Sequence, residues 1–230
     1  MKVKIFSIFT VAASMLFASA NAVAQGMNVP TIKAEQVMSG LENPWDMAFT
    51  NGGDMFFTEK CKGLSIRHAD GNVSALYGMK GSKGYKSSGK DLFCEGQAGM
   101  LGVALSRDFD KDRTLFLYST SNKYHGTGCK TNFEKCDGNI VMKFKVAKNN
   151  KSVSKRTDII KDIQYKPFKS NQPFGGPGAH NGGRIRVGPG GYLWVGTGDR
   201  HRGICPQDKP GNIHTHHGPP PLEPNAAASK

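Results

Sequence analysis

Short apolar segments separated by turns of Gly, Asn and Asp make up the chain beyond Pro30, and helical periodicity is almost absent. Several of the segments alternate apolar and polar residues with a period of two, which is the period of a β-strand. The turns at residues 51–54 and 70–72 have compositions that join antiparallel strands. The pattern therefore predicts an all-β fold built from short antiparallel strands.

The expected strands fall into groups of four. The first group is Trp45–Phe49, Met55–Thr58, Leu64–His68 and Val73–Tyr77. A polar Gly/Ser/Lys loop follows at residues 79–93, and the second group is Met100–Leu105, Leu115–Ser119, Asn139–Val146 and Thr157–Gln164. Repeated units of four antiparallel strands are typical of β-propeller blades. A β-sandwich is the structural alternative.

The stretch from His180 to Asp199 predicts a β-hairpin around a Gly-Pro-Gly-Gly turn. A two-residue loop between Gly188 and Gly191 would place His180 directly opposite Asp199. A three-residue loop with a glycine bulge would shift the register by one residue and align the apolar faces slightly better. The sequence leaves both turns open. In either case the imidazole and the carboxylate end within one residue of facing each other.

This pair has a functional and a structural interpretation. A carboxylate bound to one imidazole nitrogen fixes the tautomer and leaves the other nitrogen able to accept a proton. His180 and Asp199 are therefore candidate catalytic residues. Alternatively, they are a surface histidine and a turn aspartate that close the hairpin, and spacing by itself favours this second interpretation.

Residues 1–24 have the pattern of a secretion signal. Lys2 and Lys4 form a basic start, residues 5–17 an apolar run, and small residues a cleavage site before Gln25. The apolar run is too short to span a bilayer, and no second one follows. We expect a mature chain that begins near Gln25, has no membrane span and is periplasmic or secreted.

The formal charge of the chain is +13, or +11 without the two lysines of the signal. The lysines are scattered over residues 60–90 and 123–169, with no basic helix and no RNA-binding signature. We therefore expect no nucleic-acid partner. A solvated basic surface favours acidic partners, such as a small redox protein or the envelope.

Five cysteines, an odd number, remain after export: Cys61, Cys94, Cys129, Cys136 and Cys205. An oxidising compartment favours disulfides over metal binding. We expect Cys129 to pair with Cys136 across a short polar loop and Cys61 to pair with Cys94, although other pairs of bridges remain open. Cys205 is then left without a partner.

The ordered pattern ends soon after Asp199. Residues 209–230 are rich in proline and almost devoid of apolar residues, so they cannot extend a sheet. We expect them to be a disordered tail. His214, His216 and His217 have no Cys or carboxylate at ligand spacing, and we therefore assign no metal ligand.

Three motifs lie in a characteristic order. They are Leu41–Phe49 with the Asn-Gly-Gly-Asp turn after it, Gly96–Leu105 followed by Asp108-Phe109, and His180–Arg184 running on to Gly198-Asp199. No single motif is specific, but their order and spacing resemble the soluble quinoprotein sugar dehydrogenases, also called the glucose/sorbosone dehydrogenase family. The resemblance covers about residues 40–208 and corresponds to roughly the first half of a family member.

The resemblance implies a six-bladed β-propeller that carries pyrroloquinoline quinone (PQQ) near its axis, with calcium at the cofactor. It implies that His180 is the general base at an aldose hydroxyl, that Asp199 orients this histidine, and that Gln97 lines the sugar and cofactor pocket. A small redox protein or a dye would then accept the electrons. The chemistry agrees, because no natural side chain accepts a hydride and a cofactor is needed.

The chain also departs from the family pattern. Six blades of about 45 residues need roughly 270 residues, whereas only about two and a half blades fit here. The family's cofactor-clamping basic residues and calcium ligands lie in later blades, and no position of this sequence matches them. We expect residues 25–208 to form a partial propeller and the chain to be a truncated or frame-shifted product, prone to aggregation and of questionable activity.

Two other functions are alternatives. The first is a non-catalytic secreted propeller that binds a glycan or a protein. The second is an exported hydrolase with His180 as its base, but the sequence has no Gly-x-Ser-x-Gly elbow to supply a nucleophile.

Overall fold

The computed structural model describes residues 31–125, 137–165 and 178–198. The chain divides into two units at residue 37, and residues 31–37 of the first unit form no helix or strand. Regular structure in the described part of the second unit is almost entirely β-strand, apart from the four-residue helix α1 (Phe109–Asp112) and a 3-10 turn. The predicted all-β fold is confirmed.

Among the described residues, no helix is long and apolar enough to cross a membrane.

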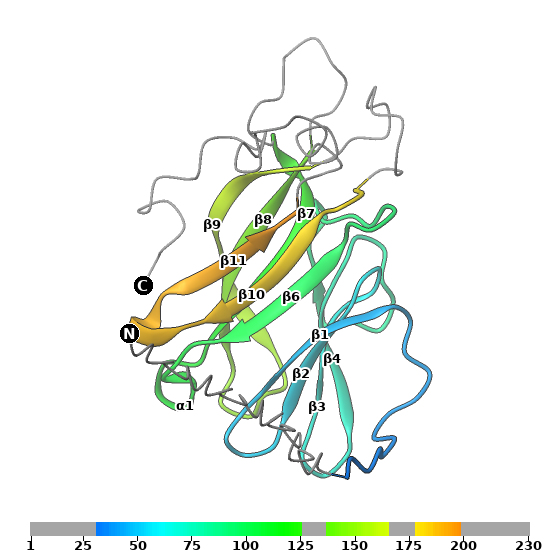
Figure 1. Cartoon of the computed structure of the whole chain (residues 1–230), viewed down its shortest axis with the longest axis vertical. Coiled ribbons are helices and arrows are strands. Elements are labelled where there is room, and N and C mark those ends of the chain that lie inside the picture. Colours follow the sequence, from blue (N-terminus) through cyan, green and yellow to red (C-terminus); the bar gives the residue numbers. More distant parts are fainter. Residues whose placement is uncertain (1–30, 126–136, 166–177, 199–230) are drawn as a thin grey trace, which may run out of the picture. The chain divides into compact units, whose positions relative to one another are not determined.

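The first sheet, called blade 1 here, is a meander of antiparallel strands in chain order (Figure 1). Its strands are β1 (Pro44–Phe49), β2 (Met55–Glu59), β3 (Gly63–Arg67) and β4 (Val73–Gly78). A two-residue strand, β5 (Ser87–Ser88), pairs in parallel with β4. The segment expected to be only a loop, residues 79–93, therefore contributes a short edge strand.

The second sheet, blade 2, has four antiparallel strands, also in chain order. They are β6 (Met100–Leu105), β7 (Thr114–His125), β8 (Asp137–Val146) and β9 (Val153–Gln164). The hairpin of β10 (Gly182–Val187) and β11 (Leu193–Thr197) begins a third sheet. All of the predicted strands are present, and β7 and β9 are longer than expected.

Blade 2 is buried on both faces, because alternate residues of its strands pack in opposite directions. In β7, Leu115 and Leu117 join a core shared with blade 1, while Phe116 and Tyr118 join a second core shared with the hairpin. A continuous apolar run is typical of such a strand. The two cores therefore lie between neighbouring sheets, as stacked blades require.

The first strands of the three sheets lie side by side, with β6 between β1 and β10 (Figure 1). Each has a register shift near its start, between Pro44 and Met47, between Met100 and Val103, and between Gly182 and Ile185. Counted from these bulges, Asp46, Gly102 and Arg184 occupy equivalent positions. A β-carbon on Gly102 would overlap the Gly183 carbonyl oxygen, so only glycine lets β10 approach β6 this closely.

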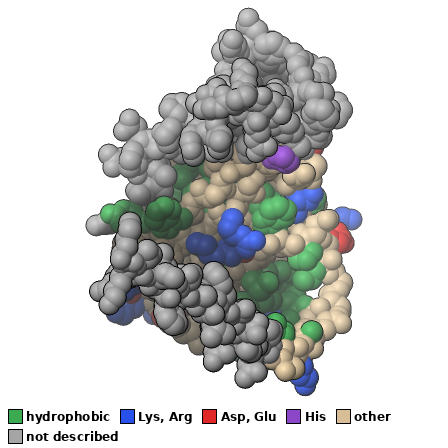
Figure 2. Space-filling model, viewed as in Figure 1, with side chains coloured by type: hydrophobic (Ala, Val, Ile, Leu, Met, Phe, Trp, Pro, Cys, Tyr) green, Lys and Arg blue, Asp and Glu red, His purple; other side chains and the backbone are tan. Residues whose placement is uncertain are grey.

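The Asp46 carboxylate connects these three first strands. Its side chain is 1% exposed, and it accepts hydrogen bonds from the backbone N–H groups of Met47 (2.9 Å) and Val103 (3.1 Å). Arg184 Nη1 donates to it at 2.9 Å, and the two terminal nitrogens of Arg186 donate at 2.7 and 2.8 Å. The hydrogen bonds between Arg186 and Asp46 raise the pKa of the Arg186 guanidinium group. Figure 2 shows basic side chains near the centre of the face on which β6 and β10 lie.

The substitution Asp46→Asn tests this connection. The amide nitrogen of Asn would face groups that are themselves donors, so the substitution should lower the free energy of unfolding by about 2–4 kcal/mol. Urea denaturation measures the difference. Asp110→Asn is the matched control, because Asp110 is exposed and its carboxylate accepts a hydrogen bond from the exposed Asn51, and it should change stability by less than about 0.5 kcal/mol. Equal effects of the two substitutions would contradict the proposed role of Asp46.

Candidate active site

Two of the three predicted site residues are in contact. Gln97 lies in the turn that precedes β6, and His180 lies two residues before the start of β10. The backbone N–H of His180 donates a hydrogen bond to Oε1 of Gln97 at 2.9 Å. Both residues are exposed, so a ligand can reach this end of the first strands.

The hairpin combines the two registers that the sequence left open. At the turn, Gly188 N–H donates to the Tyr192 carbonyl (2.9 Å), and Val187 pairs with Leu193, as a three-residue loop requires. The bulge in β10 then shifts the register back, so that Gly182 pairs with Thr197.

The third predicted site residue, Asp199, lies outside the described residues, and its contact with His180 stays a prediction. The chain just before it is close to His180, because a β-carbon on Gly198 would overlap the His180 carbonyl oxygen. His180 itself has φ +49°, in the left-handed region that few non-glycine residues adopt. The backbone on both sides of the hairpin is therefore closely constrained here.

A disulfide fixes the segment that carries Gln97. Cys61, just after β2, is bonded to Cys94, with a Cα–Cα distance of 5.1 Å. Beside it, the Lys60 ammonium group donates to the Gly96 carbonyl, and the Lys60 carbonyl accepts the Met100 N–H at 2.9 Å. The predicted Cys61–Cys94 pair is thus confirmed, whereas Cys129, Cys136 and Cys205 lie outside the described residues.

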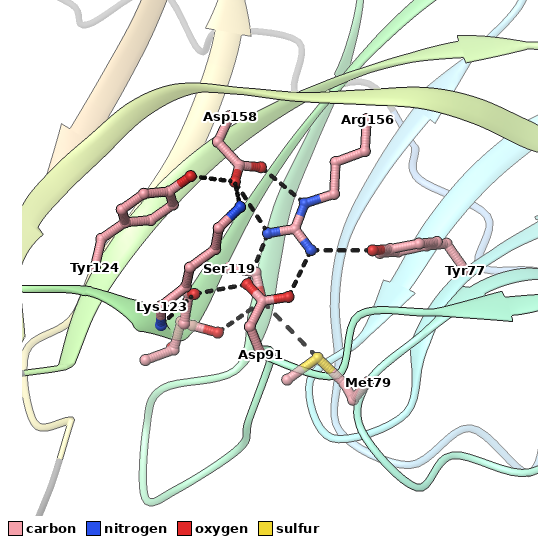
Figure 3. Close-up of polar contacts among 10 residues, drawn as sticks. Tyr77, Met79, Asp91, Ser119, Lys123, Tyr124, Arg156 and Asp158 are labelled. Carbon is pink, nitrogen blue, oxygen red and sulfur yellow. Dashed lines mark hydrogen bonds and ion pairs between the residues drawn. The ribbon is translucent and has the colours of Figure 1, made fainter.

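An ion-pair cluster lies between blades 1 and 2 (Figure 3). The Arg156 guanidinium of β9 donates to both oxygens of Asp91 at 2.7 Å and to Asp158 Oδ1 at 2.7 Å. It also donates to the hydroxyl of Tyr77 in β4 at 3.2 Å. Burial opposes ionisation of Asp91 and Asp158, but the hydrogen bonds and charge of Arg156 outweigh it, so the pKa of each carboxyl group is lowered.

Several residues that shape this region had no role in the predictions made from the sequence. Asp46, Arg184 and Arg186 lie within the quoted motifs. The ion pairs between them depend on the bulges in β1 and β10, which residue spacing in the sequence does not reveal. An acidic residue inside the otherwise apolar strand 44–49 was the available signal, since an ionised side chain in a buried strand needs a partner.

An open cavity of about 360 Å³ lies away from this pair of site residues. It is at the opposite ends of the first strands, lined by Met47–Asn51, Val103–Arg107 and Arg186–Val187. Neither Gln97 nor His180 lines it. We therefore place the candidate site at His180 and Gln97, where the chemistry-bearing side chains are, and assign no function to the cavity.

The described residues fit the implied cofactors only in part. No group of three or more His, Cys, Asp or Glu side chains among them is arranged to hold a metal ion. A carboxylate-bearing quinone needs cationic and amide donors. Arg184 and Arg186 lie on the strand that starts after His180, but their guanidinium groups are bound to Asp46.

Residues 41–219 match the Glucose / Sorbosone dehydrogenase family. The chain belongs to this family. Its relatives include the aldose sugar dehydrogenase YliI of Escherichia coli K12, 26% identical over 178 residues, which are 77% of this chain and 41% of YliI. The uncharacterised protein slr1608 of Synechocystis is 38% identical over 101 residues, or 44% of this chain and 23% of slr1608.

Solved structures of similar proteins share the fold. An oxidoreductase from Thermus thermophilus, described as a glucose dehydrogenase, matches with a TM-score of 0.54 at 25% identity, over 76% of this chain and 43% of that one. The PQQ-bound aldose sugar dehydrogenase from Streptomyces coelicolor matches with a TM-score of 0.54 at 21% identity, over 84% and 51%. The fold is therefore a partial β-propeller. The chain spans about half the length of these solved structures or less.

Glycine substitutions in β11 and beyond it test the close approach at His180. Gly198→Ala should displace the His180 carbonyl and lower the free energy of unfolding by about 1–3 kcal/mol, because overpacking forces the backbone to shift. Gly196→Ala is the control, because its β-carbon would meet its nearest neighbour at an ordinary 3.4 Å. Chemical denaturation of the two variants measures the difference, and a Gly198→Ala protein as stable as Gly196→Ala would refute the packing described.

The Arg156 cluster should give the stability a defined pH dependence. Carboxyl groups whose pKa is lowered by folding stabilise the native state above their unfolded pKa of about 4, and this contribution disappears as the pH falls through the folded pKa. Arg156→Gln should cost about 2–4 kcal/mol at neutral pH, because it leaves buried carboxylates uncompensated.

Urea denaturation at several pH values measures this cost, which should shrink as the pH falls below the unfolded pKa of about 4 and on through the lowered folded pKa of Asp91 and Asp158. The exposed Arg107 supplies the control Arg107→Gln. A cost that stayed constant from neutral to acidic pH would show that Arg156 contributes packing and not charge.

Proposed function

We propose that this chain carries the proton-accepting part of a PQQ-dependent dehydrogenase that oxidises an aldose or a related sugar alcohol. Membership of the Glucose / Sorbosone dehydrogenase family and the likeness to an aldose sugar dehydrogenase support this function. The observation that carries it is the contact between His180 and Gln97, which brings an exposed imidazole and an exposed carboxamide to one end of the first strands.

In this proposal His180 accepts the proton of the sugar hydroxyl at the carbon that is oxidised. Asp199 would bind the other imidazole nitrogen and so fix the tautomer that accepts the proton. Gln97, already bound to the His180 backbone through its oxygen, would offer its amide N–H groups to the sugar or the cofactor. PQQ, when bound, supplies the hydride acceptor that protein side chains lack.

Cofactor, partner and compartment complete the proposal. The basic residues that bind the quinone carboxylates and the ligands of calcium would be residues other than the described ones. The formal charge of +11 that remains without Lys2 and Lys4 favours a small acidic redox protein as the electron acceptor. The signal-like residues 1–24 and the Cys61–Cys94 disulfide support a periplasmic or secreted location.

The substitution His180→Asn tests the proton-accepting role. Loss of a general base lowers kcat by about 10²–10⁴-fold, whereas the KM for the sugar should change little because the substituted side chain acts in the transition state. Glucose-dependent dye reduction in the presence of PQQ and calcium measures both constants. The matched control is His68→Asn. His68 lies just after β3, and its substitution should leave kcat within about twofold.

Two results would contradict the proposal. A His180→Asn protein whose rate stays within a few-fold of the original would remove the assigned base. A chain that binds sugar without turnover, and is indifferent to added quinone and calcium, would favour the non-catalytic glycan-binding alternative.

A further inference from the structure

The residue after His180 is locked by a reciprocal pair of amides. Nδ2 of Asn181 donates to Oδ1 of Asn139 at 3.0 Å, and Nδ2 of Asn139 donates back to Oδ1 of Asn181 at 2.9 Å. Asn139 is fully buried and Asn181 is 4% exposed. Because a buried amide is costly unless its donors and acceptors are satisfied, the pair holds the Asn181 side chain in one position.

A third hydrogen bond holds the backbone of the same residue. The hydroxyl of Tyr118 donates to the Asn181 carbonyl at 3.1 Å. Tyr118 is fully buried in the core between blade 2 and the hairpin. It lies on β7 and Asn139 lies on the adjacent β8, where Asn139 pairs with Thr120. Two rigid strands of blade 2 therefore present both partners to Asn181.

These contacts act on a strained backbone position. His180 has φ +49°, a conformation that non-glycine residues rarely adopt because their β-carbon crowds the following carbonyl oxygen. Such a conformation persists only where the surrounding structure fixes it. Gln97 binds the His180 N–H on one side, and Asn139 and Tyr118 hold Asn181 on the other.

We infer that Asn139, Asn181 and Tyr118 are positioning residues that set the orientation of His180 for proton transfer. This inference rests on the proposed role of His180 as the proton acceptor. The three side chains act through the backbone at 180–181 and are themselves withdrawn from solvent, so they orient the imidazole and do not bind the sugar.

Tyr118→Phe is the main test, because it removes the hydroxyl and keeps the ring in the core. Asn139→Ala is the second variant, and it leaves the Asn181 amide without its partner. The control is Tyr77→Phe, which removes a buried hydroxyl from the Arg156 cluster between blades 1 and 2.

The first measurement needs no cofactor. Hydrogen exchange of the peptide spanning residues 178–184, followed by mass spectrometry and normalised to the blade 2 peptide 140–146, should be about five- to tenfold faster in Tyr118→Phe and in Asn139→Ala. Tyr77→Phe should leave this ratio within about twofold.

The second measurement is dye reduction with PQQ, calcium and glucose. Tyr118→Phe should lower kcat by about tenfold and keep the KM for the sugar within about twofold, because a misplaced base weakens the transition state more than substrate binding. Tyr77→Phe should change neither constant.

The outcomes separate the inference from the proposed function. Faster local exchange together with a lower kcat supports both. Unchanged exchange in Tyr118→Phe and Asn139→Ala overturns the inference, even if His180→Asn abolishes turnover. A third outcome is faster exchange in Tyr118→Phe and Asn139→Ala with full activity in these variants and in His180→Asn. It would show that the three residues hold the backbone at residues 180–181, and it would overturn the catalytic role of His180.

Discussion

A single buried carboxylate, that of Asp46, connects the first strands of all three sheets. It accepts backbone hydrogen bonds from β1 and β6 and guanidinium hydrogen bonds from β10. A buried carboxylate is stable only when such donors surround it. Asp46 lies on β1, and it binds groups of β6 and β10. It therefore fixes the spacing of these three strands, and β6 and β10 begin near Gln97 and His180.

The double-sided burial of blade 2 positions the residues around the candidate site. Strands β6 to β8 pack on blade 1 through one set of alternate residues and on the hairpin through the other. The same strands supply Tyr118 and Asn139 beneath His180, and the segment before β6 supplies Gln97. Blade 2 therefore both forms the apolar cores and positions the polar groups at the strand ends.

Much of the fold could be predicted from the sequence, because strand period and turn composition are local. The segments around Met55, Leu115 and Ile140 alternate or run apolar as buried strands do, and each became a strand. The hairpin was harder, since the choice between two registers depended on a bulge in β10 that packs against Gly102 of another sheet. Gln97 was assigned to the pocket only through the family resemblance, and its hydrogen bond to His180 was not predicted. The amide pair of Asn139 and Asn181 joins residues too distant in sequence for spacing to indicate it.

The equivalent bulge positions in the three first strands carry different residues, Asp46, Gly102 and Arg184. The backbone repeats, but the charges do not. The acid of the first sheet meets the base of the third beside a position of the second sheet that has no side chain. The sheets are therefore not interchangeable, because an acid or a base moved to the position of Gly102 would place its β-carbon where the Gly183 carbonyl oxygen lies.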